Sequence, residues 1–139
     1  MNPKQISDMF LNEYYKVMQY NREERKGLIQ FYQNTSQMSY TGSQYAGLKD
    51  IAEKIESFSF DKIEYAQMNS DVQAGPVPDS ILVFVTGYLC MDGNTEEQFR
   101  FAQAFNILPN GSGGFYIHND IFSVIQWKIN DPINICLNS

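Results

Sequence analysis

The sequence has little cysteine, histidine and basic charge, and it has no long hydrophobic run. Its two cysteines, Cys90 and Cys136, match no metal-ligand spacing and are too few for a disulfide scaffold. This favours a reduced, intracellular compartment. No apolar stretch approaches the ~18 residues of a membrane span. The start of the chain, MNPKQISDMF, does not predict a signal peptide, because no basic region precedes an apolar run.

Basic residues are outnumbered by acidic ones. The chain has 10 Lys and Arg residues against 16 Asp and Glu residues, which gives a net charge of −6 at pH 7. An acidic surface repels a phosphate backbone, so we expect no direct binding of nucleic acid. The same charge attracts a basic patch on a protein partner.

The only histidine, His118, is a weak candidate for catalysis. A general base needs a substrate pocket and often an orienting partner. Strand alternation predicts that Asp120 lies on the same face, two residues further on. The expected cavity positions are nevertheless aromatic and aliphatic, without paired carboxylates. We therefore expect His118 to be a structural or interface residue.

Apolar and aromatic residues are abundant, at 43% and 14% of the chain. A length of 139 residues with this composition predicts one folded domain with a single core. The central stretch predicts three consecutive antiparallel strands, at about 81–91, 98–108 and 115–125. The turns between them, MDGN and PNGSGG, contain the Gly and Asn residues that hairpin loops prefer.

Both faces of the first of these strands are apolar. One face carries Ile81, Val83, Val85 and Leu89, and the other carries Leu82, Phe84, Tyr88 and Cys90. A sheet with one face in water would alternate apolar and polar residues. We therefore expect the sheet to be covered twice, by the chain's own helices on one face and by a partner subunit on the other.

The first half of the chain predicts helices and short strands. Asn2 and Pro3 suit a helix start, and apolar residues then recur at three- and four-residue steps to about Met18. Further helices are expected at about 27–32 and 48–57, and further strands at about 38–40, 44–46 and 60–68. The charged segment at 21–27 is expected to be an exposed loop, with Arg22 to Lys26 in solvent, and the residues after Trp127 a loose tail.

Helices followed by strands place the chain in the α+β class. We expect a curved, antiparallel-rich sheet wrapped around a long N-terminal helix, with the convex face free to dimerise. The predicted domain covers 1–127 and the tail 128–139.

The order of several segments resembles the nuclear transport factor 2 family. These segments are an FxxxYY pattern ending in Tyr14-Tyr15, the helix start GLKDIAEK, the strand FDKI from Phe60, and the sequence NDIF ending at Phe122. The resemblance runs from about Phe10 to Phe122. It implies a cone-shaped fold, in which a bent sheet surrounds a long helix and dimerises through the sheet.

The resemblance implies a non-catalytic carrier without a cofactor, present in the cytoplasm, the nucleus and the nuclear pore. Its implied partners are the GDP-bound form of the small GTPase Ran, the FxFG repeats of nucleoporins, and a second copy of the chain. In the family, an aromatic side chain of the GTPase enters a hydrophobic cavity at the open end of the cone. The matching cavity positions are Tyr40, Phe58, Ile63, Leu89 and Phe99. The matching dimer positions are Phe84, Ala104 and Ile121.

Acidic residues at the rim of the cavity pair with basic side chains of the GTPase in this family. Asp92 matches one of them. Asn94 stands where a second carboxylate is usual, and Thr41 stands where a glutamate is usual. Glu96 and Glu97 follow in the same loop and are placed to compensate.

Two alternatives remain open from the sequence. The segment FYIHNDIF also resembles the dimer domain of Rasputin-type stress-granule adaptors, and a related mRNA-export cofactor pairs with a larger subunit, so a scaffold of the same fold is one alternative. A small-molecule enzyme using the cone cavity is the other, and it requires convergent polar groups in the pocket. An aromatic residue that helps to bind FxFG repeats in the family falls near Pro3 here, which leaves the repeat site open.

Overall fold

The computed structural model describes residues 1–126. The predicted boundary at Trp127 and the predicted tail at 128–139 lie outside the described residues. The helices are α1 (Pro3–Met18), α2 (Arg22–Arg25), a 3₁₀ helix η1 (Lys26–Phe31) and α3 (Gly47–Ser57). The strands are β1 (Tyr32–Tyr40), β2 (Ser43–Ala46), β3 (Ile63–Ala74), β4 (Ile81–Met91), β5 (Phe99–Pro109) and β6 (Phe115–Gln126). Within residues 1–126, none of the helices is both long and apolar enough to cross a bilayer.

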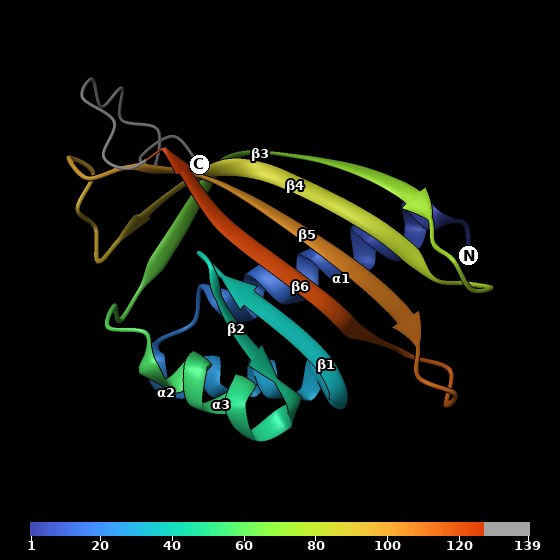
Figure 1. Ribbon diagram of the computed structural model, residues 1–139. Helices are drawn as coiled ribbons and strands as arrows, with labels where there is room; N and C mark the ends of the chain where they lie inside the picture. Colours follow the sequence, from blue (N-terminus) through green and yellow to red (C-terminus); the bar gives the residue numbers. More distant parts are fainter. Residues whose placement is uncertain (127–139) are drawn as a thin grey trace.

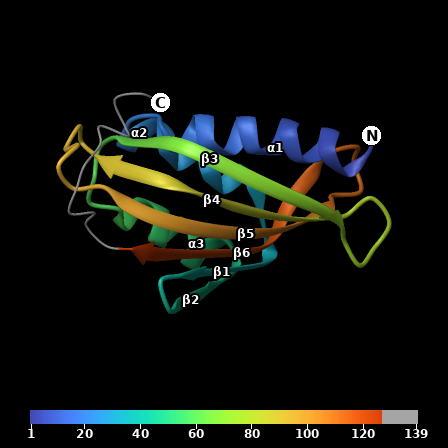
Figure 2. The ribbon, with the colours of Figure 1, turned by 90° about the horizontal axis from the view of Figure 1, so that it is seen from above.

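The six strands form one curved sheet in the order β2-β1-β6-β5-β4-β3. All neighbouring pairs are antiparallel except β1 with β6, which is parallel. Helix α1 runs along the inner side of the sheet next to β3, and α2 and α3 lie at one end, below β1 and β2 in Figure 1 (Figures 1 and 2). The predicted α+β fold, a curved sheet around a long N-terminal helix, is confirmed.

Helix α1 begins where the sequence predicts and buries the predicted face. The Asn2 side chain accepts a hydrogen bond from the backbone of Gln5, and the Gln5 side chain accepts one from the backbone of Asn2. This capping box satisfies two backbone donors that would otherwise lack partners. The buried face then packs into the sheet, with the rings of Phe10 and Phe105 5.4 Å apart.

Strand β4 shows the predicted alternation of two apolar sets. Ile81, Val83, Val85 and Leu89 are buried in the core. On the outer face, Leu82 and Phe84 remain 45% and 48% exposed in the single chain. The inner face is therefore covered by the chain's own helices, whereas the outer face presents apolar side chains to solvent.

The strand predicted at about 38–40 is too short, because β1 already begins at Tyr32. The strand carries an irregularity between Tyr32 and Gln37, where its pairing with β6 shifts. The buried Ser36 hydroxyl accepts a hydrogen bond from the backbone of Gln33 and donates one to the carbonyl of Ile117. These hydrogen bonds keep the irregular part of β1 attached to β6, although its polar residues resemble those of a turn.

The prediction of an exposed charged loop at 21–27 is wrong in its conformation and at Arg25, although Arg22, Glu23, Glu24 and Lys26 are exposed as expected. Residues Arg22–Arg25 form α2, which Asn21 caps with its side chain. Arg25 is only 1% exposed, and its guanidinium donates to the backbone carbonyls of Asp61 and Phe60, both at 2.9 Å. A charged residue can be buried here because the carbonyls just before β3 accept hydrogen bonds from its guanidinium.

Candidate partner-binding site

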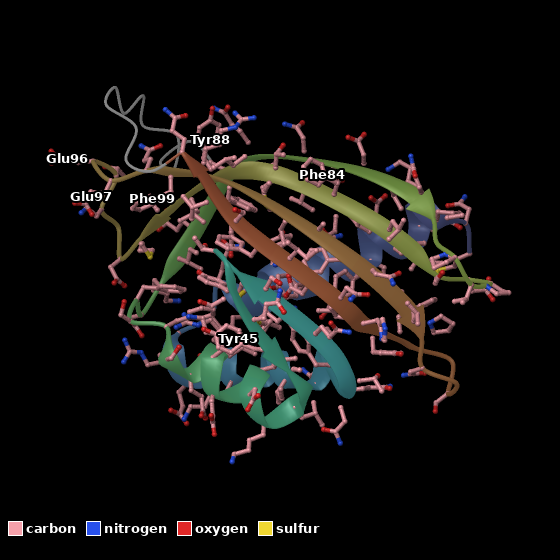
Figure 3. All side chains as sticks on the ribbon, viewed as in Figure 1. Tyr45, Phe84, Tyr88, Glu96, Glu97 and Phe99 are labelled. Carbon is pink, nitrogen blue, oxygen red and sulfur yellow. The ribbon has the colours of Figure 1, made fainter. Side chains whose placement is uncertain are left out.

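Two of the three predicted rim residues, Asp92 and Asn94, lie in a groove at one end of the molecule, where the turn between β4 and β5 meets the segment before β3. The groove has a volume of about 260 Å³, and it is lined by Ser59, Phe60, Met91, Asp92, Asn94, Glu97 and Phe99. Figure 3 shows Glu96 and Glu97 at the tip of this turn, with Phe99 close to them. We call this feature the rim groove. It brings together three predicted site residues, Asp92, Asn94 and Phe99.

Asp92 holds the shape of the rim groove. Its Oδ1 accepts hydrogen bonds from the backbone of Asp61 at 2.9 Å and of Lys62 at 2.8 Å. Its own backbone N–H donates to the carbonyl of Lys62 at 2.8 Å. Asp92 also has a positive φ of 53°, which aspartate tolerates better than most residues. This carboxylate therefore joins the β4–β5 turn to the start of β3.

The rim groove is acidic. Asp92, Glu96 and Glu97 are exposed, and among residues 1–126 none of them forms an ion pair with a Lys or Arg side chain. Asn94 accepts a hydrogen bond from the backbone of Glu96, so it helps to order the turn that carries these acids. Thr41 lies in the β1–β2 turn, exposed and with a positive φ of 47°.

Three of the predicted cavity residues, Tyr40, Phe58 and Ile63, line an internal cavity between the sheet and the helices. The cavity is also lined by Tyr14, Met18, Leu28, Tyr32, Met38, Ile55, Tyr65, Gln103, Asp120 and Phe122. Its free volume is about 20 Å³, which is room for one water molecule but not for an aromatic ring. Leu89 is buried in the core, and Phe99 lines the rim groove. The structure thus divides the predicted cavity residues among three places.

Stacked aromatic rings fill this cavity. Tyr40 stacks on Phe122 with ring centroids 4.6 Å apart, and it meets Phe58 at 5.1 Å. Phe58 stacks in turn on Phe60 at 5.3 Å, and Phe60 belongs to the rim groove. A continuous row of rings therefore connects the cavity to the acidic rim groove.

A buried polar network forms the floor of the cavity, and the sequence analysis missed it. Gln103 on β5 donates to Asp120 Oδ1 at 2.9 Å and to the Tyr14 hydroxyl at 3.2 Å, and it accepts from the Tyr15 hydroxyl at 2.8 Å. The Tyr32 hydroxyl donates to Asp120 Oδ2 at 2.8 Å. A Gln and an Asp at inward-facing positions of two strands were the available signal, but their pairing depends on strand order.

A β-bulge in β6 places Asp120 in this network. Asn119 pairs with Asn106 and Ile117 pairs with Ile107, so β6 has one more residue than β5 at this point. The extra residue lets Ile117 and Asp120 both point inward, and His118 does not share the face of Asp120. The prediction that His118 and Asp120 share a face is therefore wrong. His118 is instead half-buried beside the Tyr116 hydroxyl, 3.4 Å away.

Burial controls the ionisation of the network. It raises the pKa of Asp120 from 3.8 to about 6, although the hydrogen bonds from Gln103 and Tyr32 lower it. Burial and the charge of Asp120 raise the pKa of Tyr14 and of Tyr32 well above 10. The network's hydrogen bonds are satisfied internally and there is little free volume, so these groups have no room to act on a substrate.

The predicted dimer residues lie side by side on the outer face of the sheet. Ala104 pairs with Phe84 on β4 and with Ile121 on β6, so the three form one row across three strands. Phe84 is 48% and Ile121 54% exposed in the single chain. We call this row, with Leu82, the outer apolar face.

Known proteins resemble this chain over nearly its whole length. A family model described as the nuclear transport factor 2 (NTF2) domain matches residues 6–124. Nuclear transport factor 2B of Arabidopsis thaliana is 33% identical over 122 residues, covering 88% of this chain and 94% of that protein. Nuclear transport factor 2 of Saccharomyces cerevisiae is 33% identical over 117 residues, covering 84% and 90%.

Solved structures agree with these relatives. The structure of nuclear transport factor 2 from Cryptosporidium parvum has a TM-score of 0.76 and 31% identity, covering 89% of this chain and 98% of that one. The yeast Ubp3-associated protein Bre5 has a TM-score of 0.71 and 26% identity, covering 88% and 96%.

Proposed function

The chain belongs to the nuclear transport factor 2 family, and we propose that it is a nuclear transport carrier for the GDP-bound form of the small GTPase Ran. The observation that carries this proposal is its relationship, over most of both chains, to proteins named nuclear transport factor 2. These relatives carry the name of a transport factor, not of an enzyme, in agreement with the expected non-catalytic role.

The chemistry of the rim groove suits a partner surface that presents both basic side chains and an aromatic side chain. Its exposed carboxylates are not neutralised by the chain's own Lys or Arg residues within 1–126, so they are available to a basic surface. Phe60 and Phe99 provide apolar lining next to these charges. Burying one Phe side chain stabilises a complex by roughly 1.5–3 kcal/mol, whereas an ion pair that remains in water adds about 0–1 kcal/mol. The aromatic contact would then supply affinity, and the acids would supply orientation and association rate.

The outer apolar face supports a homodimer. A row of apolar side chains across β4, β5 and β6 is costly to leave in water, and a second copy of the same face covers it symmetrically. In such a dimer both rim grooves would remain free. Binding of FxFG repeats, and passage between the cytoplasm and the nucleus through the pore, complete the proposed role.

Binding to GDP-loaded and to GTP-loaded Ran, measured at two salt concentrations, tests the proposal. We expect preferential binding of the GDP form, with an association rate that falls as salt screens the rim carboxylates. Equal affinity for the two nucleotide states would contradict the proposed role.

An adaptor of the same fold is the second candidate, because Bre5 also resembles this chain along nearly its whole length. Such an adaptor would bind a peptide of a larger partner and would show no preference between the nucleotide states of Ran. This candidate would be favoured if the protein bound a peptide of a larger partner and did not bind Ran in either nucleotide state.

A further inference from the structure

The loop between β5 and β6 contains the only Asn-Gly pair of the sequence, Asn110-Gly111. Figure 1 shows this loop at the opposite end of β5 from the turn that carries the rim acids. Asn110, Gly111 and Ser112 are exposed, and Gly111 has a positive φ of 83°, which glycine adopts without strain. We call residues 110–114 the Asn110 loop. A glycine after asparagine leaves the backbone nitrogen of the glycine unshielded, so this nitrogen can reach the side-chain amide.

Two backbone donors hold the oxygen of the Asn110 side chain. Its Oδ1 accepts hydrogen bonds from the N–H of Ser112 at 2.8 Å and from the N–H of Gly114 at 3.1 Å. The Asn110 N–H donates in turn to the carbonyl of Gly114 at 2.9 Å, which closes the loop. Donors that are already in place stabilise a negative charge on an oxygen without rearrangement. A hydrogen bond to such an oxyanion is roughly twice as strong as one to a neutral carbonyl.

The Asn110 loop also provides a nucleophile and space for a leaving group. The Gly111 nitrogen belongs to the residue next to Asn110, so its attack on the side chain is intramolecular. Within residues 1–126 the Gly111 N–H donates no hydrogen bond, so a base in solvent can remove its proton. A Cβ at Gly114 would lie 3.0 Å from Asn110 Nδ2. The missing side chain therefore leaves room beside the nitrogen that has to depart.

We propose that Asn110 is a site of deamidation, and that the backbone N–H groups of Ser112 and Gly114 accelerate the reaction as an oxyanion hole. Hydroxide removes the Gly111 N–H proton, this nitrogen forms a bond to Asn110 Cγ, and the electron pair of the C=O bond moves to Oδ1. The pair returns as the Cγ–Nδ2 bond breaks, and Nδ2 takes a proton from water and leaves as ammonia. Water then opens the cyclic succinimide and leaves aspartate or isoaspartate at position 110.

The modification adds one negative charge to a chain whose net charge is already −6. An aspartate at position 110 retains an oxygen for the two donors, and its charge strengthens both hydrogen bonds. Isoaspartate instead adds the Cβ atom to the main chain and changes the length of the loop. The inference is independent of the proposed function, because neither the rim groove nor the outer apolar face includes a residue of the Asn110 loop.

The native protein tests this proposal when it is incubated at mildly alkaline pH, folded in buffer and unfolded in urea. Mass spectrometry of proteolytic peptides measures the gain of one mass unit at Asn110. We expect Asn110 to deamidate about two- to tenfold faster in the folded protein, because only the fold places two donors on Oδ1. Asn94, in the exposed turn after β4, is the internal reference and should not react faster when folded. An Asn110 rate that is equal or lower in the folded protein, or an equal acceleration of Asn94, would overturn the proposal.

Two variants at Ser112 test the donor itself. Ser112→Pro removes the N–H that lies closer to Oδ1, whereas Ser112→Ala retains it and is the matched control. We expect Ser112→Pro to slow deamidation of the folded protein about two- to tenfold, and Ser112→Ala to leave the rate unchanged. The difference between the two variants should disappear in urea. A folded Ser112→Pro variant that reacts as fast as the native protein, or a difference that persists in urea, would contradict a role of this donor.

Gly111→Ala tests the route through the succinimide. The added methyl group hinders the attacking nitrogen, so we expect slower deamidation in both the folded and the unfolded protein. An unchanged rate in this variant would show that water hydrolyses the amide directly, and it would overturn the proposed reaction.

Discussion

Asp120 is a buried carboxyl group whose hydrogen-bond partners within residues 1–126 are Tyr32 and Gln103, neither of which is basic. Burial opposes its ionisation, and only the donors of Tyr32 and Gln103 favour the charged form. These hydrogen bonds order the floor of the cavity. At a pH above the pKa of Asp120, however, the buried carboxylate is charged and lowers the free energy of unfolding. The residue therefore links the stability of the fold to pH.

We expect a measurable pH dependence from Asp120. Because the folded pKa is raised from 3.8 to about 6, the folded state binds this proton more tightly than the unfolded chain. The contribution of Asp120 to the free energy of unfolding is therefore greatest below pH 4, decreases as the pH rises to about 6, and is constant above. The total change is roughly 3 kcal/mol for a shift of about two pKa units.

Urea unfolding of the native protein and of Asp120→Asn between pH 4 and pH 7 measures this effect. The stability of the native protein should fall relative to that of the variant across this range. A constant difference between the two would show that Asp120 does not titrate there. Asp71→Asn, at an exposed position of β3, should follow the native profile.

Asp92 has a structural role, through its hydrogen bonds, and a proposed electrostatic role, through its negative charge. Two substitutions separate these roles. Asp92→Asn retains an oxygen that accepts from the backbone of Asp61 and Lys62, but it removes the charge. We expect it to fold normally and to associate with basic Ran more slowly, with a weaker salt dependence. Asp92→Ala also loses both hydrogen bonds, and its unfolding free energy should fall by about 1–2 kcal/mol. Equal stability of the two variants in urea would contradict this account of the rim groove.

At the scale of elements, the contact between β3 and β4 depends on Gly87. A Cβ at this position would lie 2.9 Å from Met68 Cγ, 3.2 Å from Phe101 Cε1 and 3.3 Å from the carbonyl of Ala66. The pairing of β3 with β4 shifts between Ala66 and Asn69, beside this glycine, and Gln67 has a positive φ of 49°. The missing side chain lets the bulged strand lie close to its neighbour.

We therefore expect Gly87→Ala to destabilise the protein by about 1–3 kcal/mol, because the buried ring of Phe101 and the β3 backbone cannot both move away. Thermal or urea unfolding measures the change. Gly93→Ala provides a contrast, since its Cβ would meet no atom of residues 1–126 within 4 Å and its cost would come from the positive φ of 72°. If Gly87→Ala were as stable as the native protein, β3 could shift away from the added methyl group without lowering the free energy of unfolding.

At the scale of the whole molecule, the outer apolar face should decide the oligomeric state. We expect Phe84→Lys to convert a dimer into a folded monomer, because Phe84 is half-exposed in the single chain and the two introduced lysines would repel each other across a symmetric interface. Sedimentation equilibrium measures the mass, and circular dichroism checks the fold. Val77→Lys, an exposed apolar position outside the outer apolar face, is the matched control and should remain dimeric. A native protein that sediments as a monomer would refute the proposed dimer.

The sequence alone determined the class of fold and most of its elements, because both rest on local repeats. A three- to four-residue apolar repeat with an Asn-Pro start identified α1, and an apolar stretch followed by a Gly/Asn turn identified β4, whose two faces are both apolar in the sequence. The family resemblance added the rim and cavity positions, of which the rim residues Asp92 and Asn94 and the cavity residue Phe99 share one groove. These features depend on neighbours along the chain or on a pattern shared with relatives.

Only the tertiary structure decided which polar groups meet inside the molecule. Asp120 points inward because β6 contains one extra residue, and it reaches Gln103 because β5 lies beside β6. Arg25 is buried because the carbonyls before β3, some 35 residues later in the chain, lie next to it. Lys54 covers three rings that belong to different elements. Strand order, bulges and long-range hydrogen bonds leave no periodic trace in the sequence, so these contacts could not be read from it.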